Sequence, residues 1–175
     1  MEFEILLFNK LYAFAFQSGI TDFFIIFFAR YLAYVLIATA LIILFLERNW
    51  RVRAYNISLT VLTFILSRGL IVELIRFFYQ RTRPPITLSI ESLITLPNSA
   101  SFPSGHATVF FALGTAFYFL HRGWGITFLV LATCMGVARV MTGVHWPLDI
   151  LGGALIGIVS GIIVQKLLSR FQVLS

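Results

Sequence analysis

The chain has 175 residues, of which 59% are hydrophobic and only 11% are charged, whereas soluble domains carry about 25% charged residues. This composition excludes an ordinary soluble domain and predicts an integral membrane protein, which we expect to form one domain. The net charge of +6 comes from basic residues that stand mostly in short loops. We therefore interpret it as a signal of membrane topology, and we expect no nucleic-acid partner.

Residues 1–19 are predicted to form a short helix in the membrane interface, because apolar residues recur there at helical spacing. Five apolar segments follow, and about 20 apolar residues suffice to cross a bilayer. The predicted fold class is therefore all-α, a polytopic transmembrane helix bundle with about five spans and an N-terminal interfacial helix. The predicted spans are 22–46, 55–75, 104–120, 124–141 and 147–168.

Charged residues occur within the first two predicted spans, Arg30 in the first and Arg68 and Glu73 in the second. Arg30 leaves the start of the first span open, because either its side chain reaches the interface or the span begins after it. Arg68 and Glu73, in the second span, are expected to pair or to contact a polar interior. The single cysteine, Cys134, excludes a disulfide within the chain and is expected to be a buried thiol.

The segment between the second and third spans, at about 76–103, is predicted to be a long loop because it contains four prolines. Apolar residues within 85–102 suggest a lid that lies against the bilayer. These residues are Ile86, Leu88, Ile90, Leu93 and Leu96.

In the last span, Gly153, Gly157 and Gly161 recur at four-residue spacing and predict close helix packing, within the chain in preference to a dimer.

We assume that successive spans cross the membrane in alternating directions. One side of the membrane then holds the end of the second span, the start of the third, the end of the fourth and the start of the fifth. This side carries Arg76, Arg83, Ser104, His106, Arg139, His145 and Asp149. The opposite side carries Arg48, Arg51, Arg53, Arg122, Lys166 and Arg170. The positive-inside rule favours the latter side as cytoplasmic, so we expect the site to face outward.

The residue types on the shared side suit a phosphate ester. A phosphoryl group spreads negative charge over its oxygens in the transition state, so fixed cations and backbone amides must surround it. Arginine matches phosphate oxygens and stays charged, which makes Arg76, Arg83 and Arg139 the candidates. Arg81 is expected to face solvent or lipid headgroups.

Ser104 and Gly105 are expected to open the third span, where the free amides of a helix N-terminus attract anions. His145 precedes Asp149 by four residues, so both side chains can share one helix face. A carboxylate bonded to one ring nitrogen would leave the other free to attack phosphorus, and His106 can then protonate the leaving oxygen. This chemistry predicts a covalent phosphohistidine, later hydrolysed by water, with no metal and no other cofactor. Each feature alone is typical of a cap, a turn or a headgroup anchor, and only their coincidence on one side favours catalysis.

Three sequence motifs of this chain are similar to those of a known family. The chain resembles the type 2 phosphatidic acid phosphatase superfamily, the membrane lipid phosphate phosphatases related to vanadium haloperoxidases. The pattern of that family is Lys, six residues, Arg-Pro; then Pro-Ser-Gly-His; then Ser-Arg, five residues, His, three residues, Asp. Here the motifs run from Arg76 to Pro84, from Pro103 to His106 and from Ala138 to Asp149. Arg76 replaces the usual Lys, and Ala138 replaces the usual Ser.

The resemblance implies the same roles as the chemistry above. It implies phosphate binding by Arg76, Arg83, Ser104, Gly105 and Arg139. It implies that His106 is the general acid, His145 the nucleophile and Asp149 its partner.

Within the superfamily, His145-Trp146-Pro147-Leu148-Asp149 looks most like the bacterial undecaprenyl diphosphate phosphatases. These recycle the lipid carrier of cell-wall synthesis at the outer face of the inner membrane. The alternatives are a phosphatase of phosphatidylglycerophosphate, phosphatidic acid or lipid A, and, in a different class, a transporter or flippase that binds an anionic lipid without cleaving it. In every case the expected partner is a membrane lipid with a phosphate headgroup.

Overall fold

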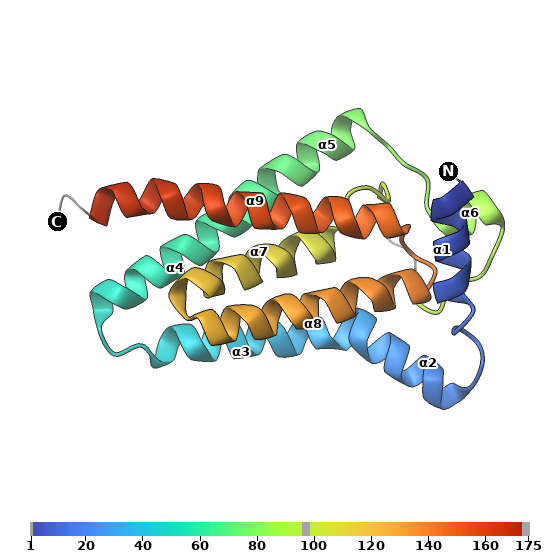
Figure 1. The fold of residues 1–175 in the computed structure, drawn as a ribbon, viewed down its shortest axis with the longest axis horizontal. Coiled ribbons are helices and arrows are strands. Elements are labelled where there is room, and N and C mark those ends of the chain that lie inside the picture. The colour runs from blue at the N-terminus through green and yellow to red at the C-terminus, as the bar shows by residue number, and fades with distance from the viewer. Residues whose placement is uncertain (1, 96–98, 173–175) are drawn as a thin grey trace.

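The computed structural model describes residues 2–95 and 99–172, and within these residues every regular element is a helix (Figure 1). The all-α prediction is thereby confirmed. Two of the segments, η1 and η2, are π-helical turns inside longer rods. In chain order the elements are α1 (Glu2–Tyr12), α2 (Gly19–Ile26), η1 (Phe27–Tyr31), α3 (Leu32–Leu46), α4 (Trp50–Phe64), η2 (Ile65–Ile71), α5 (Val72–Phe78), α6 (Pro84–Leu88), α7 (Gly105–Leu120), α8 (Arg122–Met141) and α9 (Pro147–Gln172).

Four rods among the described residues are long and apolar enough to cross a membrane. They are Gly19–Leu46, Trp50–Phe78, Arg122–Met141 and Pro147–Arg170. The fifth apolar helix, α7, has 16 residues, a length of about 24 Å, whereas the hydrocarbon core of a bilayer is about 30 Å thick. The predicted multi-pass bundle is confirmed, with α7 as its short member. The first rod continues as one helix through Arg30, and where on this rod the membrane span begins stays open.

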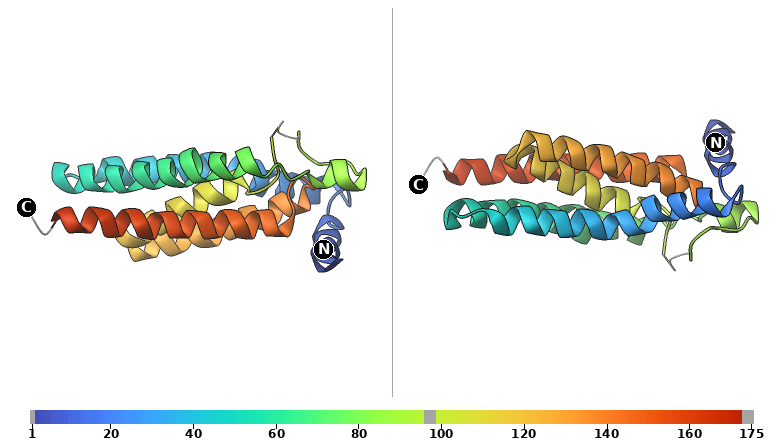
Figure 2. Two further views of the ribbon diagram at one scale, coloured as in Figure 1. Left: turned by 90° about the horizontal axis from the view of Figure 1, so that it is seen from above. Right: turned by 90° about the horizontal axis from the view of Figure 1, so that it is seen from below.

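The short helix α7 runs through the middle of the bundle, beside α8 and α9 (Figures 1 and 2). Its aromatic side chains Phe110 and Phe117 are buried against Phe128 of α8 and against α3. A helix that is apolar on most of its surface and only about 24 Å long can end below the membrane surface. In the structure, α7 begins farther inside the bundle than the start of α9 and the end of α8 (Figure 1).

Glycines let α9 approach α7 closely. A methyl group added at Gly157 would stand 2.5 Å from the carbonyl oxygen of Thr108, and one at Gly153 would stand 2.6 Å from that of Ser104. The prediction that these glycines serve packing within the chain is confirmed. The same approach brings the backbone N–H of Ser104 to the carbonyl oxygen of Asp149, at 3.0 Å, and so joins the two helix ends that carry site residues.

The two ends of the bundle differ. One end holds α1, α6 and the α8–α9 turn, and the other holds the α3–α4 and α7–α8 turns and the end of α9 (Figure 1). Helix α1 lies crosswise over its end and packs through Phe8, which is buried against Val140 and Trp146. Its Phe3 and Leu6 are exposed, as expected for a helix in the membrane interface.

Two expectations need correction. Cys134 is exposed on the outward side of α8 rather than buried in protein, whereas its neighbours Ala132 and Met135 are buried. Within the expected lid, Leu88 and Ile90 pack against the cluster of Phe8 and Trp146 instead of the bilayer. Ile86 is exposed, the backbone N–H of Leu93 donates to the carbonyl of Thr142, and Leu96 lies outside the described residues.

The contact at Gly157 predicts a stability effect. In Gly157→Ala the added methyl group meets the backbone of Thr108 and Ala112, which cannot rotate away, so α7 and α9 must separate. We expect a loss of about 1–3 kcal/mol, measured as a lower midpoint of thermal unfolding in detergent. Gly19→Ala is the matched control, because its methyl group meets nothing within 4 Å; equal midpoints for the two variants would contradict this packing.

Candidate active site

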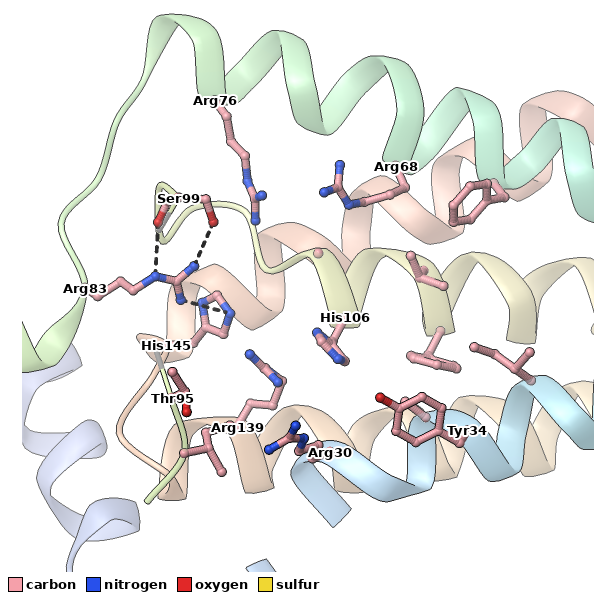
Figure 3. Close-up of a pocket in the computed structure, with 17 residues that line it drawn as sticks. Arg30, Tyr34, Arg68, Arg76, Arg83, Thr95, Ser99, His106, Arg139 and His145 are labelled. Carbon is pink, nitrogen blue, oxygen red and sulfur yellow. Dashed lines mark hydrogen bonds between the residues drawn. The ribbon is translucent and has the colours of Figure 1, made fainter. Parts of the chain in front are cut away.

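A cavity of about 610 Å³ opens between the first two rods, the start of α7 and the loop before it (Figure 3). Five arginines and two histidines line it, and among the described residues no carboxylate does. They are Arg30, Arg68, Arg76, Arg83, Arg139, His106 and His145. Arginine at membrane depth is costly and marks functional sites, and this concentration of positive charge makes the cavity a site for an anion.

The structure brings the predicted site residues together. Six of the eight line the cavity, namely Arg76, Arg83, Gly105, His106, Arg139 and His145. Ser104 and Asp149 are fully buried directly behind it. Segments from 76 to 149 thus converge at one end of the bundle, as alternating spans require, and the catalytic and binding roles of these residues stay predictions.

His145 lies in the α8–α9 turn, and Asp149 lies in the first turn of α9. The Nδ1 atom of His145 is 3.4 Å from Oδ2 of Asp149, so the carboxylate lies on one side of the ring. Nε2, on the other side, faces the cavity, 3.4 Å from the guanidinium of Arg83. The ring is thus oriented with Nε2 toward the space where an anion would bind.

Burial controls the charge of this imidazole. The pKa of His145 is lowered from its ordinary value of 6.5 to about 4, mainly because the buried site disfavours the imidazolium. Arg139 and Arg83 repel the proton as well, while the Asp149 carboxylate acts in the opposite direction. His145 is therefore neutral near pH 7, which is the form that has a free electron pair on Nε2.

Arg83 is held rigidly by the loop that follows α6. Its guanidinium donates to the carbonyls of Ser99, Ala100 and Val144 at 2.8–3.2 Å, and its Nη2 also lies 3.2 Å from the Ser99 hydroxyl. A side chain fixed by four contacts has already lost its rotamer entropy. Arg83 can therefore meet a ligand at little further cost.

Arg76 and Arg139 are anchored by one contact each. Arg76 donates to the carbonyl of Pro103 at 2.9 Å, and Arg139 donates to the carbonyl of Ala29, in η1, at 3.2 Å. The Nε atoms of both are buried and have no hydrogen-bond partner within residues 2–95 and 99–172. Buried donors left unpaired are costly, so these two guanidinium groups retain donors for an anion.

The start of α7 forms one wall of the cavity. Ser104 is its N-cap residue, and the hydroxyl of Ser104 is fully buried without a hydrogen-bond partner in the part of the chain that the structure describes. Gly105 lets the Arg68 side chain approach the backbone of α7 closely, because a Cβ atom at position 105 would stand 3.2 Å from Nε of Arg68. His106 follows on the first turn and points into the cavity between the two rods (Figure 3).

Sequence reasoning missed the partners of Asp149. Arg81, expected to face solvent or headgroups, instead donates to Oδ1 of Asp149 at 2.8 Å and to Glu4 of α1 at 2.7 Å. The Ser101 hydroxyl and the backbone N–H of Trp146 donate to Oδ2. Residues 79–83 form no regular helix or strand, so sequence periodicity gave no signal for the direction of the Arg81 side chain.

Arg68 meets both expectations, because it pairs with Glu73 and its side chain lines the polar cavity. The side chain of Arg30 lines the cavity as well, which sequence reasoning did not predict. Both come from π-helical turns, η1 and η2, and periodicity arguments for regular helices do not anticipate such turns. Among the described residues, no three His, Cys, Asp or Glu side chains form a group that could hold a metal ion.

Comparison with known proteins gives one family and a consistent set of relatives. The family model described as the PAP2 superfamily matches residues 57–172. The bacitracin transport permease protein BcrC of Bacillus licheniformis is 33% identical over 79% of this chain and 67% of its own length. The undecaprenyl-diphosphatase BcrC of Bacillus subtilis is 29% identical over 92% of this chain and 81% of its own length. The crystal structure of Aquifex aeolicus LpxE has a TM-score of 0.74 at 31% identity, covering 93% of this chain and 94% of that one.

The charge state of His145 can be measured directly. We expect its imidazole to stay neutral as the pH falls from 7 to about 5 and to gain a proton only near pH 4. Protein labelled with ¹⁵N-histidine in detergent micelles would report this by NMR, with His145→Gln to assign the signal among the three histidines. Arg83→Gln should raise the pKa of His145, because it removes a positive neighbour. Titration of wild-type His145 near 6.5 would contradict the proposed effect of burial.

The Arg81 bridge predicts a second stability effect. Arg81→Met leaves Oδ1 of the buried Asp149 without a donor, and an unsatisfied buried acceptor costs about 1–3 kcal/mol. We expect a lower thermal midpoint in detergent. Arg122→Met, at the opposite end of the bundle, is the control; an Arg81 variant as stable as this control would show that the bridge contributes nothing.

Proposed function

This chain belongs to the PAP2 superfamily of membrane lipid phosphatases, and we propose that it hydrolyses undecaprenyl diphosphate to undecaprenyl phosphate and inorganic phosphate. The observation that carries the proposal is the His145–Asp149 pair, in which Nε2 of the histidine faces a cavity lined by arginines, 3.4 Å from Arg83. The undecaprenyl-diphosphatase of Bacillus subtilis, similar over most of this chain, supports the choice of lipid.

The terminal phosphate would bind among Arg76, Arg83 and Arg139. Each of these side chains presents a guanidinium to the cavity, and two of them retain an unpaired buried Nε. The amides and hydroxyl at the start of α7, around Ser104 and Gly105, would complete the set of donors. Fixed positive groups of this kind stabilise the charge that spreads over the phosphoryl oxygens in the transition state.

The first step forms a phosphohistidine. The electron pair on Nε2 of His145 attacks phosphorus, and the bond from phosphorus to the bridging oxygen breaks. The leaving oxygen takes the electron pair of that bond, and His106 supplies its proton. Asp149, fixed by Arg81 and Ser101, stabilises the positive charge that the ring carries in the intermediate.

The second step restores the enzyme. Water attacks the phosphorus of the phosphohistidine, while His106, now neutral and basic, takes a proton from that water. The bond from phosphorus to Nε2 breaks, and its electron pair returns to His145. Because the arginines supply the positive charge throughout, this mechanism assigns no step to a metal ion.

The site would face outward at a bacterial inner membrane. Basic residues gather at the end of the bundle opposite to the cavity, in the α3–α4 and α7–α8 turns and near the end of α9 (Figure 1). By the positive-inside rule this end would be cytoplasmic. Recycling of a lipid carrier for cell-wall synthesis at the outer face accords with that orientation.

A second candidate, transport of an anionic lipid or peptide complex, is suggested by the name of the Bacillus licheniformis relative, a transport permease protein. Binding alone would use the arginines. A transporter would have no use for the alignment of Nε2 by Asp149. A measurement of phosphate release distinguishes hydrolysis from transport.

The test is phosphate release by purified protein in detergent with EDTA present. Undecaprenyl diphosphate, phosphatidylglycerophosphate, phosphatidic acid and lipid A would be compared, and we expect the diphosphate to have the highest kcat/KM. His145→Ala should lower kcat by at least about 10³-fold, because it removes the nucleophile. When a reaction with ³²P-labelled substrate is stopped without acid, the label should remain bound to the wild-type protein and not to the variant. No release from any lipid would refute hydrolysis and favour transport, whereas full release by His145→Ala would refute His145 as the nucleophile.

A further inference from the structure

We propose that Arg68 and Arg30, carried on the π-helical turns η2 and η1, form a second phosphate subsite that holds the lipid-side phosphate of a diphosphate substrate. This subsite would make the enzyme prefer lipid diphosphates to lipid monophosphates. The inference rests on the proposed phosphatase function and goes beyond it, since neither residue belongs to the three motifs.

The two arginines flank His106 from opposite sides. Arg68 comes from the second rod and Arg30 from the first, with the His106 ring between them (Figure 3). Arg76, Arg139, Arg83 and His145 lie together farther toward the end of the bundle (Figure 3). Arg68 also adjoins Arg76, because a Cβ atom at Gly105 would stand 3.2 Å from Nε of Arg68 and 3.7 Å from Nη2 of Arg76. The two phosphate positions would therefore be neighbours, with the expected general acid His106 beside them.

This order matches the order of groups in a lipid diphosphate. The terminal phosphate would lie at His145, the bridging oxygen at His106, and the second phosphate beyond His106 at Arg68 and Arg30. The lipid chain would then extend away from the charged end. Cavity walls change in the same direction, from arginine to the apolar side chains of Ile37, Phe64 and Val109.

The apolar end of the first cavity adjoins a second cavity. A second space of about 280 Å³ lies between α3, α4 and α7 and shares Ile37, Phe64 and Val109 with the first. All its other walls are apolar except Thr60. A hydrocarbon chain that leaves the headgroup beside Arg68 and Arg30 would enter this space, which sets the direction of the substrate in the cavity.

The chemistry of the leaving group explains why these cations would discriminate. When a monophosphate ester is cleaved, the leaving group is an alcohol, which needs only a proton from His106. When a diphosphate is cleaved, the leaving group is a lipid phosphate, which carries negative charge that increases as the bridging bond breaks. Two guanidinium groups at that phosphate therefore stabilise the transition state of diphosphate cleavage and add nothing comparable for the monophosphate.

The local structure shows that both arginines are positioned for the cavity. A π-helical turn adds a residue to the helix and is frequent at functional sites; two such turns face the same cavity from different rods. Glu73 pairs with one side of the Arg68 guanidinium, while its Nε lies toward Gly105. Arg30 has no hydrogen bond or ion pair among the described residues and contacts the ring of Tyr31, so its donors are available.

The experiment compares farnesyl diphosphate with farnesyl monophosphate, which share one chain and differ by one phosphate. We expect Arg68→Gln and Arg30→Gln each to lower kcat/KM for the diphosphate by about 10- to 100-fold, the size of one hydrogen bond to a charged group. For the monophosphate we expect a change of less than about threefold, and Arg68→Lys should restore part of the diphosphate rate. Arg122→Gln, at the opposite end of the bundle, is the control for loss of an arginine.

A binding measurement makes the test independent of turnover. Methylene diphosphonate should inhibit monophosphate hydrolysis by wild-type protein, and its inhibition constant should rise about 10-fold or more in Arg68→Gln. The inhibition constant of vanadate, which occupies the terminal-phosphate position alone, should stay unchanged. Equal losses on both farnesyl substrates, or an unchanged diphosphonate constant, would overturn the second subsite. A wild-type protein that cleaves neither substrate would instead overturn the proposed function.

Discussion

The buried carboxylate of Asp149 is the interaction on which the rest of the site depends. It accepts hydrogen bonds from Arg81, from the Ser101 hydroxyl and from the backbone N–H of Trp146, and it lies beside Nδ1 of His145. Its own backbone carbonyl accepts from the N–H of Ser104. A single residue thereby joins α9, the start of α7, the loop before α7 and, through Arg81 and Glu4, the crosswise helix α1. A buried charge is tolerated only when it is fully paired, so these parts must meet for Asp149 to be buried at all.

Positive charge sets a second constraint. Five arginines converge on one cavity, where they repel one another and are costly to bury. The protein fixes them with backbone carbonyls, as at Val144, Pro103 and Ala29, and leaves donors unpaired on Arg76 and Arg139. An anion would relieve both the repulsion and the missing hydrogen bonds. The site is therefore organised for a phosphate before any substrate arrives, which is what electrostatic preorganisation requires.

The short helix α7 explains how a polar site can lie inside an apolar bundle. Because α7 is about a turn or more shorter than a full span, its N-terminus opens a recess that the flanking rods enclose. The glycines of α9 let α7 sit against it at backbone contact distance, and the apolar space below continues between α3, α4 and α7. The headgroup and the chain of a lipid would thus find their environments in one continuous cavity.

Composition and motif spacing were enough to establish a helical membrane protein, the number of its apolar segments and the convergence of Arg76, Arg83, His106, Arg139 and His145 on one side. The reason is that apolar length decides whether a segment crosses the bilayer, and alternation of the spans then decides which ends share a face. Sequence also predicted the packing of Gly153, Gly157 and Gly161 within the chain, because small residues at helical spacing permit a close approach. Only the tertiary structure decided that Arg81 and Glu4 support Asp149, that Leu88 and Ile90 pack inward, and that Arg30 enters the cavity. Long-range contacts between a loop and a crosswise helix leave no periodic trace in the chain, and a π-helical turn rotates a side chain away from the position that a regular helix would give it.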